Sequence, residues 1–205
     1  MKKLLATAAL LLATSGASAA LMGQAPAPTL VRGTVASLSG QTLMVNGKNG
    51  RKYSVKLASD TRVAGVSVIG IDAIQPNSFI GTAAEPGPNG TLRATEVHVF
   101  PESMRGAGEG HRAWDLSKTS SMTNGNVATV GKGKAGKGRT LVVDYKGGQQ
   151  TVVVPANVPI VAFAPATMAL VKPGAHVFAI TTPDVGGALA AASLAVGING
   201  TVPPM

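Results

Sequence analysis

The chain has 205 residues, a formal net charge of +9 and no cysteine. The lack of cysteine excludes disulfides, thiolate metal sites and a lipid-modified cysteine. Aromatic residues make up only 3% of the chain, whereas it contains 26 glycines and 13 prolines. Together with abundant valine and threonine, this composition favours short strands and turns over long helices.

The first 19 residues have the pattern of a cleaved export signal. Lys2 and Lys3 precede an apolar run at 4–13, and a small-residue Ala-Ser-Ala site follows at 17–19. This run is about half of the roughly 20 residues that a membrane span needs. We therefore expect cleavage after Ala19, a location in the periplasm or outside the cell, and no transmembrane span after cleavage. Loss of the two lysines lowers the formal charge from +9 to +7.

Two stretches of the remaining chain resemble each other. Residues 42–64 align without gaps with residues 140–162, with nine identities in 23 positions, Val55 with Val153 among them. The offset, which is the difference in residue number between aligned positions, is 98 in this stretch. It is 92 upstream, where GTVASL aligns with GNVATV, and 97 downstream. Self-similarity of this kind indicates a tandem duplication.

Each copy is predicted to contain about five short strands. In KYSVKL, apolar and polar residues alternate, which is typical of a strand with one solvated face, and GKNG and KGG are hairpin turns. GALAAASLAVGI is rich in alanine but aligns with GTLRATEVHVF, so we expect a strand there too. In the first copy the strands are expected at 30–38, 41–46, 52–57, 78–84 and 91–100, with an irregular or helical piece near 71–74.

The expected fold class is all-β, with two tandem small OB-like antiparallel β-barrels joined by a Gly-rich linker. Closure is favoured because five short strands in about 70 residues cannot cover both faces of an open sheet. The expected boundaries are the signal peptide at 1–19, a flexible N-terminal segment at 20–29, the first barrel at 30–100, the linker at 101–121, the second barrel at 122–201 and a tail at 202–205.

The stretch GKGKAGKGRT at 131–140 imitates a phosphate-binding loop. A dinucleotide or P-loop fingerprint needs a helix directly after its glycines, whereas RTLVVDY predicts a strand. We therefore expect no nucleotide and interpret the stretch as a basic hairpin loop. Its cations, Lys132, Lys134, Lys137 and Arg139, could attract an anionic surface in a salt-dependent way.

The segment from His98 to Val127, around the linker, carries two of the three histidines and the single tryptophan. Its string FPESMRGAGEGHRAWDL, followed by SMTNGNV, resembles a family of exported, uncharacterised bacterial proteins with repeated OB-like domains. The resemblance implies that fold and no established activity. The name metal ABC transporter permease, which is sometimes attached to this family, requires several membrane spans, and the chain has no apolar run of that length after the signal.

A divalent metal site is one hypothesis for this segment. Glu96 and His98 are two apart on a predicted strand and share a face, and a loop carrying Glu109, His111 and Asp115 could fold back towards them. Imidazole and carboxylate groups together suit zinc or a similar ion. The simpler alternative places Glu96 and His98 on a solvated face and uses the loop carboxylates to fix the linker.

The other linker residues are expected to hold the barrels together. Trp114 can bury a large area between two small domains, while Arg105 and Arg112 can pair with nearby carboxylates. A ligand-binding role for the loop GAGEGHR is the alternative.

Catalysis is not expected, because the chain has no G-x-S-x-G or H-E-x-x-H motif. Nucleic acid is disfavoured, since single-strand binding relies on aromatic stacking platforms that this chain mostly lacks. The leading hypothesis is a non-catalytic exported binding module that engages an envelope protein or an anionic envelope polymer or surface. The alternative is a periplasmic divalent-metal-binding protein; no other cofactor is expected.

Overall fold

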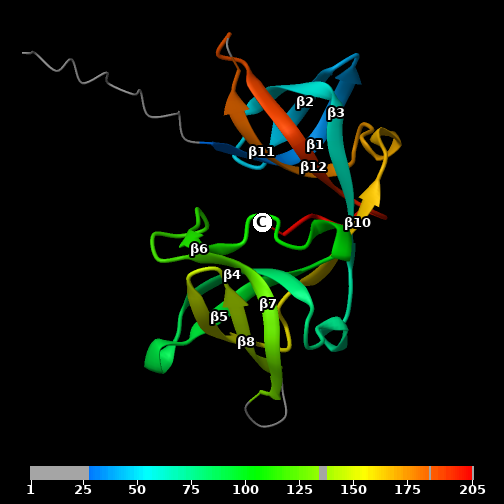
Figure 1. Cartoon of the computed structure of the whole chain (residues 1–205). Coiled ribbons are helices and arrows are strands. Elements are labelled where there is room, and N and C mark those ends of the chain that lie inside the picture. The colour runs from blue at the N-terminus through cyan, green and yellow to red at the C-terminus, as the bar shows by residue number, and fades with distance from the viewer. Residues whose placement is uncertain (1–27, 134–137, 185, 205) are drawn as a thin grey trace, which may run out of the picture.

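The computed structural model describes residues 28–133, 138–184 and 186–204, and within them the protein is all-β, with no α-helix (Figure 1). No helix in this part of the chain is long and apolar enough to cross a membrane. The strands are β1 (Thr29–Ser39), β2 (Thr42–Gly47), β3 (Lys52–Val68), β4 (Phe79–Pro86), β5 (Leu92–Phe100), β6 (Gly110–Ala113), β7 (Ser121–Lys132), β8 (Arg139–Tyr145), β9 (Gly148–Val154), β10 (Ile160–Ala166), β11 (His176–Pro183) and β12 (Leu189–Gly197).

The strands form two closed rings, one above the other in Figure 1. In the upper barrel the order is β1-β2-β3-β12-β11, and β11 closes back onto β1. In the lower barrel the order is β7-β8-β9-β5-β4, and β4 closes back onto β7. Within the rings, the β3–β12 and β5–β9 pairs are parallel and the other pairs are antiparallel. Strand β10 lies outside both rings, antiparallel to β3 and parallel to β5. The short strand β6 lies outside the ring, paired with β7.

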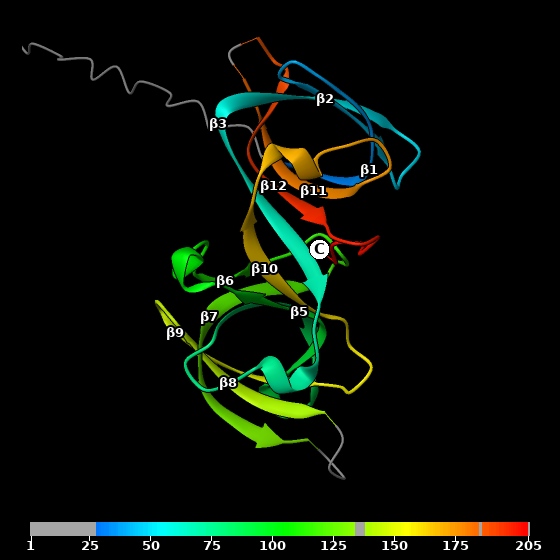
Figure 2. The ribbon, with the colours of Figure 1, turned by 90° about the vertical axis from the view of Figure 1, so that its right-hand side faces the viewer.

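The two barrels do not follow the two halves of the sequence. We expected 30–100 and 122–201 each to close on itself, but β1 to β3 close with β11 and β12, while β4 and β5 close with β7 to β9. The cause is β3, which does not end near residue 57 as expected but continues to Val68. It leaves the upper barrel and runs down to the lower one, so that β4 begins there (Figure 2).

The two rings share the same pairing pattern. A register shift between Val35 and Ser37 in the upper barrel has a counterpart between Val127 and Thr129 in the lower one, which agrees with the offset of 92. The strand over residues 189–197, expected despite its alanines, is confirmed.

The alignment of Val55 with Val153 is wrong by one residue. Val55 lies opposite Leu43, whereas Val152 lies opposite Leu141. Val55 and Val152 are therefore the counterparts, and the offset changes from 98 to 97 inside the hairpin. Five residues, 47–51, separate the paired Asn46 and Lys52, whereas four, 145–148, separate the equivalent pair Asp144 and Gln149. The one-residue difference between the two copies therefore lies in this hairpin, and not after residue 64, where the gap-free alignment ends.

Each barrel has its own core, and a third apolar cluster lies between them. The upper core includes Val31, Leu43 and Val55, and the lower core includes Leu141 and Val152. Inward residues alternate with outward ones, as the period of a half-buried strand requires. The third cluster is built on Val66, Val161, Phe163, Phe178 and Ala195, with Leu30, Phe100, Met104 and Trp114 packed against it.

Candidate functional site

The linker between β5 and β7, residues 101–120, carries half of the candidate residues and contacts both barrels. Its Trp114 ring lies 6.5 Å from the ring of Phe178 on β11 of the upper barrel, centroid to centroid. The guanidinium of Arg32 lies 5.2 Å from the Phe178 centroid and 6.0 Å from that of Trp114. Arg112 lies 5.8 Å from the Trp114 centroid, and its burial lowers the pKa of its guanidinium.

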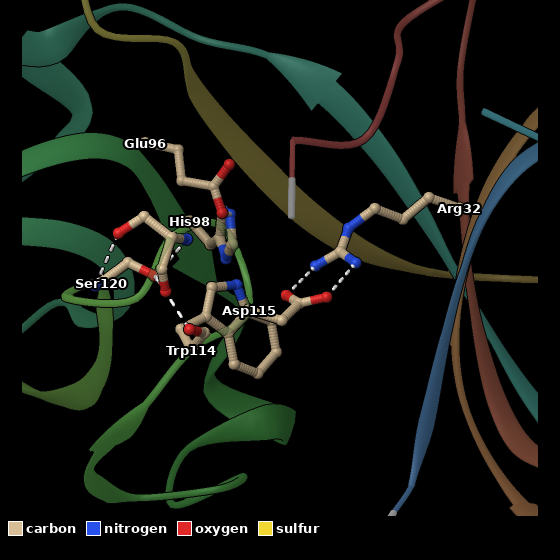
Figure 3. Close-up of polar contacts among 7 residues, drawn as sticks. Arg32, Glu96, His98, Trp114, Asp115 and Ser120 are labelled. Atoms are coloured by element: carbon tan, nitrogen blue, oxygen red, sulfur yellow. Dashed lines mark hydrogen bonds and ion pairs between the residues drawn. The ribbon is translucent and has the colours of Figure 1, made fainter. Parts of the chain in front are cut away.

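An ion pair reinforces this contact with the upper barrel. The Nη1 and Nη2 atoms of Arg32 donate to the two carboxylate oxygens of Asp115 over 2.7 and 2.6 Å (Figure 3). Such a two-pronged arrangement fixes orientation as well as distance. Trp114 and Asp115 therefore contact the upper barrel from the linker, and the role of Trp114 in orienting the barrels stays a prediction.

The earlier part of the linker binds the lower barrel. Arg105 donates to Glu102 over 2.6 Å and to the carbonyl oxygen of Asn77 over 3.0 Å, and it also bonds the Asn126 side chain on β7. The pair with Glu102 raises the pKa of Arg105 and lowers the pKa of Glu102.

Two further linker side chains hold the β7 to β9 region. Glu109 Oε1 accepts a hydrogen bond from the backbone N–H of Lys146 over 3.0 Å. His111 Nδ1 lies 2.8 Å from Thr123 Oγ1, and its ring is stacked on Tyr145 with centroids 6.1 Å apart. The side chains that seemed available for a ligand are thus occupied by contacts within the protein.

The end of the linker is attached to β4 through Glu85. The hydroxyls of Ser117 and Thr119 each donate to its carboxylate over 2.7 Å. These two hydrogen bonds hold the pKa of Glu85 below its ordinary value of 4.5.

Glu96 and His98 are buried, 5% and 1% exposed, so the expectation of a solvated face is wrong. The His98 ring packs against Phe100 on the same strand and against Phe163 on β10, which pairs with β5. Glu96 Oε1 and His98 Nε2 lie 3.3 Å apart, and neither makes a well-formed hydrogen bond. The indole nitrogen of Trp114, beside them in Figure 3, is also buried and has no hydrogen-bond partner.

The five residues proposed for a metal site do not come together as a set. Glu96 and His98 are neighbours, but Glu109, His111 and Asp115 each bind a different partner. In the described ranges, no group of three or more histidine and acidic side chains is arranged to hold a metal ion. Two donors supply half of the four positions that a structural zinc ion fills.

The basic loop at 131–140 is described only in part. β8 begins at Arg139, so a strand follows Gly138, as expected. Arg139 forms an ion pair with Asp72, and Lys132 is exposed at the end of β7. Lys134 and Lys137 lie outside the described residues.

A basic hairpin in the upper barrel was not singled out from the sequence. Lys48, Arg51 and Lys52 are exposed at the β2–β3 turn, and none of their side chains forms an ion pair within the described ranges. We call these three residues the cationic hairpin. Its sequence signal is three cations in five residues without an acid, whereas the counterpart hairpin carries only Lys146.

The cationic hairpin is held in place from within and from β1. Asn49 donates to the hydroxyl of Tyr53 over 2.6 Å and accepts from the backbone N–H of Arg51 over 3.0 Å. The backbone N–H of Lys48 donates to the carbonyl oxygen of Arg32 over 3.0 Å. The three cations therefore project from a fixed turn.

A cleft of about 870 Å³ lies between β3, β10, β12 and the linker. Asp60, Arg62 and Ser103 are among its lining residues, and the lining includes no histidine. Arg105 points its charge at Glu102.

These observations define an all-β protein with closed barrels and a linker that holds them together. No family model, no curated protein and no solved structure matches the chain, so nothing identifies a family.

Proposed function

We propose that the protein is a non-catalytic exported binding module that engages an anionic envelope surface through the cationic hairpin. The observation that carries this proposal is the position of Lys48, Arg51 and Lys52, which are adjacent, exposed and without an acidic partner in the described part of the chain. By contrast, Arg32 pairs with Asp115 and Arg139 with Asp72.

The proposal includes a finer description of the fold. We interpret the two rings as OB-like barrels that arose by duplication and exchanged strands, because each is a small five-stranded ring with one parallel pair. The N-terminal pattern supports export to the periplasm or the cell exterior. The contacts made by the linker support a role in fixing the barrels rather than in binding a ligand.

The expected strength follows from electrostatics. A lysine or arginine near an anionic membrane surface contributes about 1 kcal/mol at low ionic strength. Three together contribute about 3 kcal/mol, which is roughly a hundredfold in affinity. Salt screens this attraction, so binding should weaken as ionic strength rises.

Vesicle sedimentation of the mature chain tests the proposal. We expect binding to vesicles that contain anionic lipid and none to neutral vesicles, with loss of binding at high salt. The variant Lys48→Gln/Arg51→Gln/Lys52→Gln should bind roughly a hundredfold more weakly. The control Arg93→Gln/Lys118→Gln/Lys172→Gln removes the same charge from exposed sites elsewhere and should bind nearly as well as the unmodified chain. No binding at low salt, or equal loss in both variants, contradicts the proposal.

A further inference from the structure

The two halves of the chain, before and after the linker, complete each other's barrels. Of the 13 strand pairings in the described ranges, six join a strand of one half to a strand of the other: β1–β11, β3–β12, β3–β10, β4–β7, β5–β9 and β5–β10. Both rings therefore depend on both halves.

Neither half can bury its own core. The first half brings a three-stranded piece to the upper barrel, with Val31, Leu43 and Val55 fully buried, and a two-stranded piece to the lower one. The cover over the three-stranded piece comes from the second half, from residues such as Leu194 and Val196. A half on its own would expose these side chains and the unpaired edges of β1, β3, β4 and β5, which favours association.

The pairing between β3 and β10 has the symmetry of a two-fold interface. Val66 lies opposite Phe163, which occupies the same position in the second half at the offset of 97. Val68 lies opposite Val161, and the residues equivalent to these two, Pro165 and Ala64, also lie opposite each other. Each half thus presents the same segment to the other in antiparallel fashion. This is the isologous geometry of a C2 homodimer, in which each subunit uses one surface twice.

We infer that the chain is a fused pair of half-length subunits, in which the surface of each half fits the complementary half, from the same copy or from a second copy. The covalent linker brings the halves together but is not needed to hold them. This interaction surface is independent of the cationic hairpin and of its proposed ligand.

Cleavage of the linker in the full chain tests the inference. A specific protease site is inserted between Gly106 and Ala107, which are exposed, and a Cβ atom at Gly106 would meet no neighbour. We expect the cleaved halves to elute together at the position of the uncleaved protein, with the same circular dichroism spectrum. The Tm should depend on protein concentration only after cleavage, because unfolding then separates two chains. Halves that elute apart, folded or unfolded, overturn the inference.

A second measurement asks whether a half accepts its partner from another molecule. Cleaved protein with and without ¹⁵N label is mixed, unfolded and refolded, and native mass spectrometry should find about half of the particles as hybrids, as random pairing requires. Val66→Asp, at a position that is 0% exposed, should separate the cleaved halves, whereas Val68→Asp, at a position 68% exposed, should leave them together. Absence of hybrids contradicts the inference. If uncleaved Val66→Asp does not fold, the unsubstituted cleaved protein decides the question.

Discussion

The upper and lower barrels are alike on the inside and different on the outside. Leu43 and Leu141 occupy the same place in the two cores and are both 0% exposed. On the outer face, by contrast, Glu96 and His98 of the lower barrel correspond to Ser193 and Ala195 of the upper barrel at the offset of 97. The inside of each ring is fixed by closure, whereas the outside is free to diverge according to what covers it.

The buried pair on the lower barrel should produce the largest effect. His98→Leu leaves Glu96 buried without its partner, and breaking a buried pair in this way costs about 3–5 kcal/mol. Denaturant unfolding measures the loss. The double variant Glu96→Met/His98→Leu should recover most of it, since apolar replacement of both partners is often neutral. A double variant as unstable as the single one would show that the pair itself is not the cause.

The two cores should respond alike to the same truncation. Leu43→Ala and Leu141→Ala each remove a fully buried side chain, and each should lower the free energy of unfolding by about 2–5 kcal/mol. Because either barrel contains strands of both halves, we expect one cooperative transition in each variant. Two separate transitions, by calorimetry or by denaturant, would mean that the barrels fold independently.

A smaller effect is expected where the linker joins the upper barrel. Asp115→Asn keeps the shape of the side chain but removes the charge that pairs with Arg32. The carboxylate side chain is 47% exposed, so solvent screens the pair and the loss should be about 1 kcal/mol or less. Asp144→Asn, on an exposed residue of β8 without an ion pair in the described ranges, is the matched control. A loss above 2 kcal/mol would contradict this view of the pair as a modest contributor.

The smallest effect is a local one at acidic pH. The folded state lowers the pKa of Glu85, so its stabilising contribution is present above the ordinary value of 4.5 and is lost as pH falls through the lower folded value. Amide exchange at Thr119 and Ser120, measured on either side of this range and corrected for intrinsic rates, should become less protected at the acidic end. Glu85→Gln should remove this pH dependence; an unchanged dependence would place its origin elsewhere.

The sequence predicted most of the strands, but not β6, β10 or the continuation of β3 to Val68, and it did not predict how the strands pair. Alternation predicted the strands, and glycines predicted the hairpins. The repeat correctly identified β12 as a strand in spite of its alanines. The closing partner of β3 could not be predicted, because both copies offer the same kind of strand, and a ring closed within a copy looks the same in sequence as one closed between copies.

The candidate site shows the same limit. The position of Trp114 between the barrels could be inferred from its size and its place in the linker. The burial of Glu96 and His98 could not, since alternation tells which face of a strand a side chain occupies but not what lies against that face. The sequence predicted the cationic hairpin as a turn. Only the structure shows that its three cations have no acidic partner in the described ranges.

The route of β3 sets an order for biosynthesis. Among the described strands, β1 to β3 are synthesised first, yet their ring cannot close until β11 and β12 have been made. The lower barrel, by contrast, has all its strands once β9 is complete. The apolar face of β1 to β3 thus stays uncovered until β11 and β12 have been made, a condition that exposes unfinished chains to aggregation.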